Sequence, residues 1–239
     1  MPIIYQILLE DNTSGSSNVA VGSLCLTDNT TGGSNTSVGF AALRYGTTSS
    51  NNSALGSGAA QNTTGSNNTA IGQNALSVNT SGGDNTVVGS VALDANTTGS
   101  RNTAVGRDSL GQNTTGSDNV VIGQSAFSRQ TTVNSNVGIG NEAGHFQTGS
   151  DNVAIGRAAF KGTSSGTYDG QYNTAVGGSA LFNNTTANNN TAVGYAALQA
   201  NTTGTPNTAV GLSALQDCTT GTHNTAIGYV SGENITTGT

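Results

Sequence analysis

The sequence predicts an all-β protein, a parallel β-solenoid of about thirteen 17-residue turns. A five-residue motif, typified by Asn68-Thr69-Ala70-Ile71-Gly72, recurs thirteen times, and its glycines are 17 residues apart except for two intervals of 16 and one of 21. Aliphatic residues return at fixed places within each interval, as in arrays whose repeats stack on one another. The anchor glycines are Gly22, Gly39, Gly56, Gly72, Gly89, Gly106, Gly123, Gly140, Gly156, Gly177, Gly194, Gly211 and Gly228.

Composition argues against a helical array and against disorder. Charged residues make up 8% of the chain and hydrophobic residues 33%, while glycine, asparagine and threonine are abundant. No apolar stripe with a 3.6-residue period is present, and these residue types have low helix propensity. Disordered chains usually combine high net charge with a lack of regular apolar positions, whereas here the aliphatic residues are strictly periodic.

An asparagine stands four residues before every anchor glycine. Stacked turns would align these side chains in a column, where each amide can donate to one neighbour and accept from the other. Alternatively, asparagine suits the bend that enters the strand, because it tolerates left-handed conformations and caps its own backbone. The column comprises Asn18, Asn35, Asn52, Asn68, Asn85, Asn102, Asn119, Asn136, Asn152, Asn173, Asn190, Asn207 and Asn224.

Alternation along the strand divides the motif between two faces. Threonine and the aliphatic residue before glycine share one face, and asparagine and alanine share the other. Valine replaces threonine in four repeats, which favours an inward position for the threonine and the aliphatic residue. We therefore expect the alanines to point outward and to pack against other copies of the chain, most simply in a trimer.

The remainder of each repeat is expected to turn, extend again and turn back. The anchor glycine should end the first strand, since glycine adopts positive φ without steric cost. Alanine three residues later and leucine or phenylalanine four residues later, as at Ala75-Leu76, should begin a second short strand with the larger side chain inward. A polar bend such as Asn62-Thr63-Thr64-Gly65 then closes the turn.

Both ends of the array are expected to be covered. Residues 1–11 include the most hydrophobic stretch, Pro2 to Leu9, and stand outside the repeat; they are read as an N-terminal cap or as a strand that pairs with a neighbouring subunit. Residues 12–239 form the repeat array. No polar cap follows the last repeat, which indicates either a fragment or an end covered by another subunit.

Two turns depart from the pattern. The 21-residue interval inserts four residues near 161–170, and a bulging surface loop is expected there. Loops carry function more often than the elements they connect, so Lys161, Tyr168, Asp169 and Tyr172 are the candidate partner contacts, although a merely tolerated insertion is the alternative. Around residues 136–146 the repeat degrades, with Gly144 where leucine is expected.

The sequence contains no constellation that indicates catalysis. His145 and His223 are separate and are expected in loops or facing solvent, and Cys25 and Cys218 lie too far apart in the array to pair. No metal-ligand spacing, dinucleotide motif or catalytic triad is present, so we expect no enzyme, no metal and no cofactor. Six scattered basic residues and a net charge of −6 argue against nucleic acid. No bilayer-spanning stretch or signal peptide is found.

The repeat resembles two families of surface proteins. Asn190-Thr191-Ala192-Val193-Gly194-Tyr195-Ala196-Ala197-Leu198 is similar to repeats of phage tail-fibre-like proteins, and the motif resembles head repeats of trimeric autotransporter adhesins. The resemblance covers residues 18 to about 232. It implies a left-handed parallel β-roll that forms a homotrimer, lies outside the cell or on a virion and serves in attachment.

Two classes of function therefore remain. The first is a structural or adhesive fibre that associates with itself, as a trimer or filament, at a cell or virion surface, with a host-surface receptor or glycan as a further partner. The alternative is a ligand-binding or ice-binding solenoid, in which rows of threonine order water. The inward position expected for the strand threonines argues against the alternative.

Overall fold

The computed structural model describes residues 10–163 and 167–238 and contains one short strand per repeat. No helix in these ranges is long and apolar enough to cross a membrane. Residues 1–9, most of the expected N-terminal cap, lie outside the described part. The strands are β1 (Val19–Val21), β2 (Thr36–Val38), β3 (Ser53–Leu55), β4 (Thr69–Ile71), β5 (Thr86–Val88), β6 (Thr103–Val105), β7 (Val120–Ile122), β8 (Val137–Ile139), β9 (Val153–Ile155), β10 (Thr174–Val176), β11 (Thr191–Val193), β12 (Thr208–Val210) and β13 (Thr225–Ile227).

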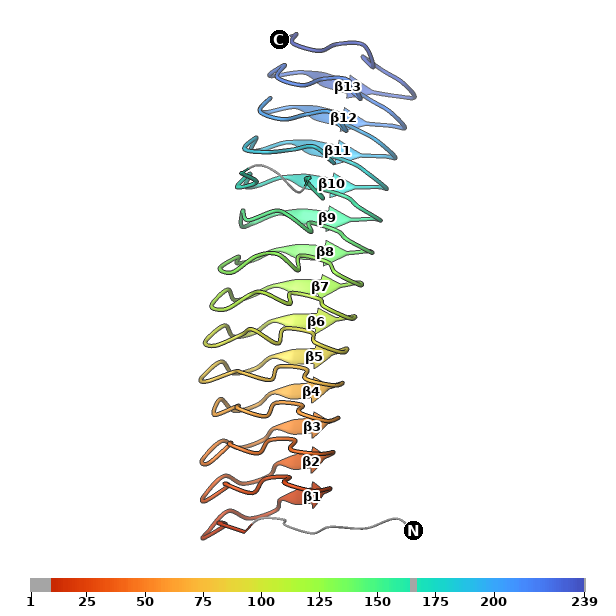
Figure 1. The fold of residues 1–239 in the computed structure, drawn as a ribbon. Coiled ribbons are helices and arrows are strands. Elements are labelled where there is room, and N and C mark those ends of the chain that lie inside the picture. The colour runs from red at the N-terminus through yellow and green to blue at the C-terminus, as the bar shows by residue number, and fades with distance from the viewer. Residues whose placement is uncertain (1–9, 164–166, 239) are drawn as a thin grey trace, which may run out of the picture. The chain divides into compact units, whose positions relative to one another are not determined.

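The chain divides into two compact units, residues 1–118 and 119–239. In the first unit β1 to β6 pair in chain order, and in the second β7 to β13 do the same; all of these pairings are parallel. Each unit is therefore a β-solenoid whose strands lie one above the next (Figure 1). The register places equivalent repeat positions side by side, as for Thr69 beside Thr86 and Ile71 beside Val88.

The strand faces lie opposite to the expected orientation. The middle residue is buried in twelve of the thirteen strands, whereas the flanking residues are exposed or half-buried. In β4, Ala70 is fully buried, and Thr69 and Ile71 point outward. The prediction of inward threonine and outward alanine was therefore wrong.

The width of the interior explains this orientation. Leu76 and its equivalents in the opposite wall are fully buried, as expected, and they leave room for only a small side chain on the strand. A Cβ added to Gly232, at the leucine position, would lie 2.9 Å from Leu215 and 3.7 Å from Ala226, a strand alanine. Alanine thus fits the narrow space, and the branched side chains of the motif are placed outside.

The second strand expected in each repeat is replaced by a turn. Residues two and four positions after the anchor glycine adopt positive φ. After Gly39, for example, φ is 54° at Ala41 and 46° at Leu43. As a result, the N–H groups of these two residues point in opposite directions along the stack. Ala41 N–H donates to the carbonyl of Ser23 below (2.9 Å), and Leu43 N–H donates to that of Ala59 above (3.0 Å). The wall is therefore hydrogen-bonded between turns without being a β-strand.

The irregular turn at residues 136–146 is complementary to the turn before it. Phe127 occupies the leucine position and is fully buried. A Cβ on Gly138 would lie 2.5 Å from the Phe127 ring, and one on Gly144 would lie 2.3 Å from it. The two glycines therefore make the space that the larger phenylalanine ring occupies.

Candidate functional site

The outer face of the strands carries a regular row of exposed aliphatic side chains. We call the outward residues at the first and third positions of each strand the strand face. Residues at the third position include Val21 (55% exposed), Leu55 (50%) and Ile71 (39%) in the first unit, and Ile122 (40%), Val193 (36%) and Ile227 (71%) in the second. Exposed apolar surface that recurs in this way usually marks an interaction site.

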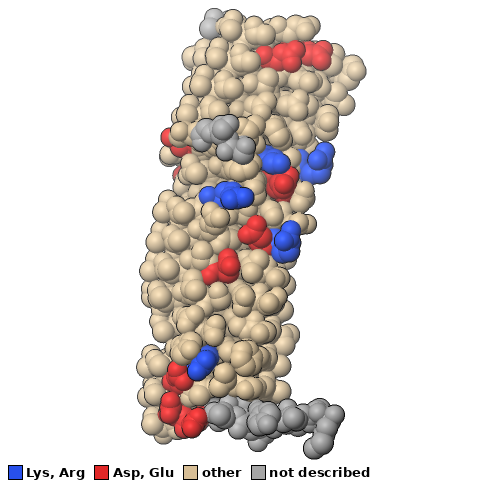
Figure 2. Space-filling model, in the orientation of Figure 1, with Lys and Arg blue, Asp and Glu red and all other residues tan. Residues whose placement is uncertain are grey.

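The strand face has no charged residue, and it extends at some turns beyond the anchor glycine. No described strand contains Lys, Arg, Asp or Glu. The residue after the glycine is exposed and apolar or aromatic at Phe40 in the first unit and at Tyr195, Leu212 and Tyr229 in the second. Charged side chains elsewhere are sparse and scattered on the side drawn in Figure 2.

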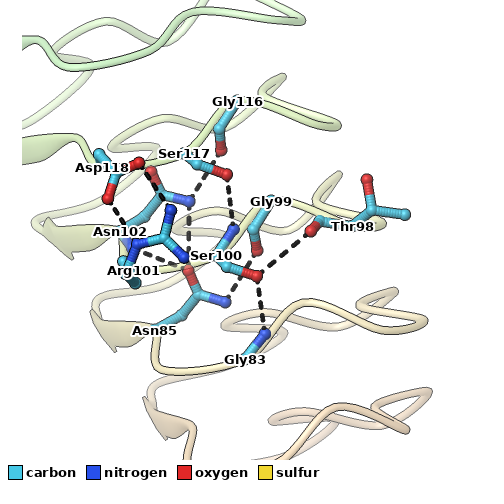
Figure 3. A network of polar contacts seen from close by, with 10 residues as sticks. All are labelled: Gly83, Asn85, Thr98, Gly99, Ser100, Arg101, Asn102, Gly116, Ser117 and Asp118. Atoms are coloured by element: carbon cyan, nitrogen blue, oxygen red, sulfur yellow. Dashed lines mark hydrogen bonds and ion pairs between the residues drawn. The ribbon is translucent and has the colours of Figure 1, made fainter.

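Eleven of the thirteen strand asparagines are buried, Asn18 and Asn224 being half-buried, and a typical buried one is hydrogen-bonded to two other turns. The N–H of Asn85 donates to Oδ1 of Asn68 (3.0 Å), and Oδ1 of Asn85 accepts from the N–H of Asn102 (3.0 Å). Its Nδ2 donates across the interior to the carbonyl of Gly99 (3.0 Å; Figure 3). The asparagine thus joins the strand to its neighbours and to the bend that closes the same turn. Both sequence interpretations, a column and a bend, describe part of this arrangement.

A second column of buried amides lies in the closing bends. Asn96 Nδ2 donates to Oδ1 of Asn79 (2.8 Å), and Asn201 Nδ2 donates to Oδ1 of Asn184 (3.0 Å). Sequence reasoning missed these residues because it treated the bends as polar surface. Their recurrence seven residues after the anchor glycine was the available signal. The column comprises Asn29, Asn79, Asn96, Asn113, Gln130, Gln147, Asn184 and Asn201.

The residue before each strand asparagine lies at the edge of the strand face, and it adopts positive φ in every repeat except the one where Pro206 stands. Arg101, which holds this position before β6, donates from Nε and Nη2 to the two carboxylate oxygens of Asp118, at 2.6 and 2.8 Å (Figure 3). The hydrogen bonds from Arg101 hold the pKa of Asp118 below its ordinary value. Both side chains are about half exposed, so the pair adds little to stability.

The four residues of the candidate contact loop do not form one surface. Lys161 Nζ pairs with Glu142 Oε2 at 2.8 Å, and the Tyr168 ring is buried beside Phe146. Residues 164–166 lie outside the described residues. Asp169 and Tyr172 are exposed, and both line a hollow of about 400 Å³ together with Gln171, Thr186, Asn188 and Asn189.

The histidines and cysteines have structural positions. His145 is buried rather than solvent-facing, and its Nδ1 lies 2.9 Å from both Ser128 Oγ and the carbonyl of Ser125. Its packing within the irregular turn could not be read from its isolated place in the sequence. Cys25 and Cys218 are buried and free. Within residues 10–163 and 167–238, no three His, Cys, Asp or Glu side chains gather as metal ligands.

Comparison with protein families, with curated proteins and with solved structures finds no match to the chain.

Proposed function

We propose that the protein is a structural fibre subunit that assembles with copies of itself through the strand face. The observation that carries the proposal is the uncharged row of Val, Ile and Leu side chains, one per turn and in register, of which seven are exposed and six half-buried. The resemblance of the repeat to adhesin-head and tail-fibre repeats supports a place at a cell or virion surface.

A second copy of the chain suits this face better than an unrelated partner. The row repeats at the strand spacing, about 4.8 Å. A copy presents the same row with the same spacing, so side chains can interdigitate turn after turn. The alanines fill the interior, so the threonine and aliphatic residues of the strand, and not the alanines, would form the contact between copies.

The energy scale favours association of whole arrays. Covering a half-exposed aliphatic side chain contributes about 1 kcal/mol, so thirteen turns contribute on the order of 10 kcal/mol. Association costs roughly 4–15 kcal/mol in lost translational and rotational freedom. The contribution of one turn therefore falls short of this cost, whereas the summed contribution of the array is of the same size as the cost.

A matched pair of substitutions tests which surface is used. Ile71 lies on the strand face and is 39% exposed; Val78 lies outside it, in the closing bend, and is 38% exposed. We expect Ile71→Lys to weaken self-association at least about 100-fold in analytical ultracentrifugation, because the interface would bury an unpaired ammonium. Val78→Lys should leave the mass unchanged. Equal behaviour of the two variants, with equal melting temperatures, would contradict the proposal.

Ice binding is the second candidate function, and the orientation of the threonines favours it. Threonine occupies the first strand position in eight of thirteen repeats and points outward, which removes the objection drawn from the sequence. A regular outward row of hydroxyl and methyl groups could order water. A monomeric protein that produces thermal hysteresis in freezing solution would select this candidate; an oligomer without thermal hysteresis would select the fibre.

A further inference from the structure

We infer that the hollow between the turns that precede β10 and β11 binds a neutral carbohydrate. The hollow is lined by equivalent positions of two consecutive repeats: Asp169, Gln171 and Tyr172 in one, and Thr186, Asn188 and Asn189 in the next. Its volume of about 400 Å³ lies at the lower end of the range for small-molecule sites.

In the turn before β10, Gln171 and Tyr172 are larger than the residues that most other repeats have at the same positions. Serine stands at the position of Gln171 in Ser50, Ser66, Ser100, Ser117 and Ser150, among others. Ser, Asn or Asp usually stands at the position of Tyr172, which is 59% exposed. The larger Gln171 and Tyr172 side chains therefore raise a wall that the common repeat does not have. This wall directly follows the four-residue insertion.

Backbone contacts hold the hollow while leaving its side chains available. The N–H of Gln171 donates to Asn188 Oδ1 (2.6 Å), and the N–H of Asn189 donates to the Gln171 carbonyl (3.1 Å). Within the described residues, the side-chain polar groups of Asp169, Gln171 and Tyr172 make no hydrogen bond or ion pair. The same holds for Thr186 and Asn189 there.

These groups match the chemistry of a sugar. A sugar hydroxyl both donates and accepts hydrogen bonds, and carboxamides and hydroxyls do the same. The Tyr172 ring offers an apolar face on which the C–H face of a pyranose can pack. Among the described residues no basic side chain lines the hollow, so none of them would compensate an anionic ligand. A neutral oligosaccharide is accordingly the ligand class that the lining favours.

Substitution by the common repeat residue gives a conservative test. Ser17, Ser34 and Ser135 hold the Tyr172 position with φ of 58°, 59° and 55°, close to 57° for Tyr172. Tyr172→Ser should therefore keep the fold while it removes the ring. Gln171→Ser/Tyr172→Ser restores the common sequence and removes the wall. Asp151→Ser, at the same position one turn earlier and outside the hollow, is the matched control.

The probes are soluble neutral oligosaccharides ending in glucose, galactose, mannose or N-acetylglucosamine, with sialylated and sulfated forms for comparison. Binding is measured by calorimetry and saturation-transfer NMR with monovalent ligands, so that the outcome does not depend on self-association. We expect at least one neutral probe to bind, with a dissociation constant raised about tenfold or more by Tyr172→Ser. Asp151→Ser should leave that constant unchanged, and the double variant should abolish binding.

Three results would overturn the inference. The first is that no neutral probe binds the full chain; the second is that Tyr172→Ser, with an unchanged circular dichroism spectrum and melting temperature, binds as well as the wild type. The third is a preference for the sialylated or sulfated forms. None of these results bears on the mass of the protein, so failure here is distinguishable from failure of self-association.

Discussion

The glycine that ends each strand meets two separate requirements. Gly72 has φ of +135°, and a Cβ on it would lie 2.5 Å from the carbonyl oxygen of Gly89 in the next turn. Gly228, in the last repeat, has φ of +124°, but its Cβ would meet nothing closer than 4.0 Å. The first position therefore combines an unfavourable conformation with a close approach, while the second has the conformation alone.

Alanine at these two positions should separate the two costs. Gly228→Ala should lower the free energy of unfolding by about 1–2 kcal/mol, the cost of a non-glycine residue at positive φ. Gly72→Ala should lower it by about 3 kcal/mol or more, because the backbone of the next turn must also move. Urea denaturation measures both values. Similar losses for the two variants would show that stacking contact at the glycine is unimportant.

The strand asparagines require an amide rather than a carboxylate. Asn85 is fully buried, and its Nδ2 faces two acceptors, the Gly99 carbonyl at 3.0 Å and Asn68 Oδ1 at 3.1 Å. In Asn85→Asp an ionised oxygen would face those acceptors. We expect this variant to lose about 3 kcal/mol of stability at pH 7, the scale of an unpaired buried charge.

The loss should depend on pH in a defined direction. Burial beside two acceptors raises the folded-state pKa of the new carboxyl above its unfolded value of about 3.9. The penalty is therefore full above the folded pKa, and it shrinks as the pH falls through that pKa and the protonated acid donates. Asn67→Asp is the control, since Asn67 is exposed and Asp84, Asp118 and Asp151 hold the same repeat position. A pH-independent difference between the variants would contradict the interpretation.

At the scale of the element, one turn compensates for the next. Phe127→Leu should cost about 1–2 kcal/mol by leaving unfilled space above Gly138 and Gly144. Gly138→Ala alone should be destabilising, because its Cβ would meet the Phe127 ring at 2.5 Å. The double variant restores the common residues at both positions and should be more stable than the sum of the single effects predicts. Additive losses in thermal or urea unfolding would refute the coupling.

The sequence predicted the elements of this fold better than their orientation. The spacing of the repeats was sufficient for the parallel register. The inward Leu76 and its equivalents were predicted from the recurring Ala-Leu pair, although the second strand expected there is a turn. Orientation failed at Thr69, Ala70 and Ile71 because alternation defines two faces but does not say which is interior. That choice follows from the narrow space opposite Leu76 and from the hydrogen bonds of Asn68, both of which depend on the closed turn.

Some residues of the candidate site were predicted from the sequence, and others were missed or misplaced. Asp169 and Tyr172 were identified from the insertion that precedes them. Asn188 was missed because it lies beside Gln171 only when consecutive turns stack. Tyr168 was misplaced because an insertion predicts a surface loop but does not reveal that its ring packs beside Phe146.

At the scale of the molecule, the interior is small and the outer face of the strands is uncharged, with an aliphatic residue at the third position of every strand. Alanine and a single leucine or phenylalanine fill most turns, and the valines and isoleucines at the third strand position, which an ordinary domain would bury, lie on the outside. An isolated chain would leave this face in water at every turn. The monomer is therefore incomplete under the proposed function, in which copies of the chain associate through the strand face.

The most direct test is the mass of the wild-type protein in solution, measured by multi-angle light scattering over a wide range of concentration. We expect a particle whose mass is a multiple of the 23.6 kDa chain, either a discrete oligomer or a growing filament. A mass of 23.6 kDa at every concentration would contradict it, since the strand face would then remain exposed to water.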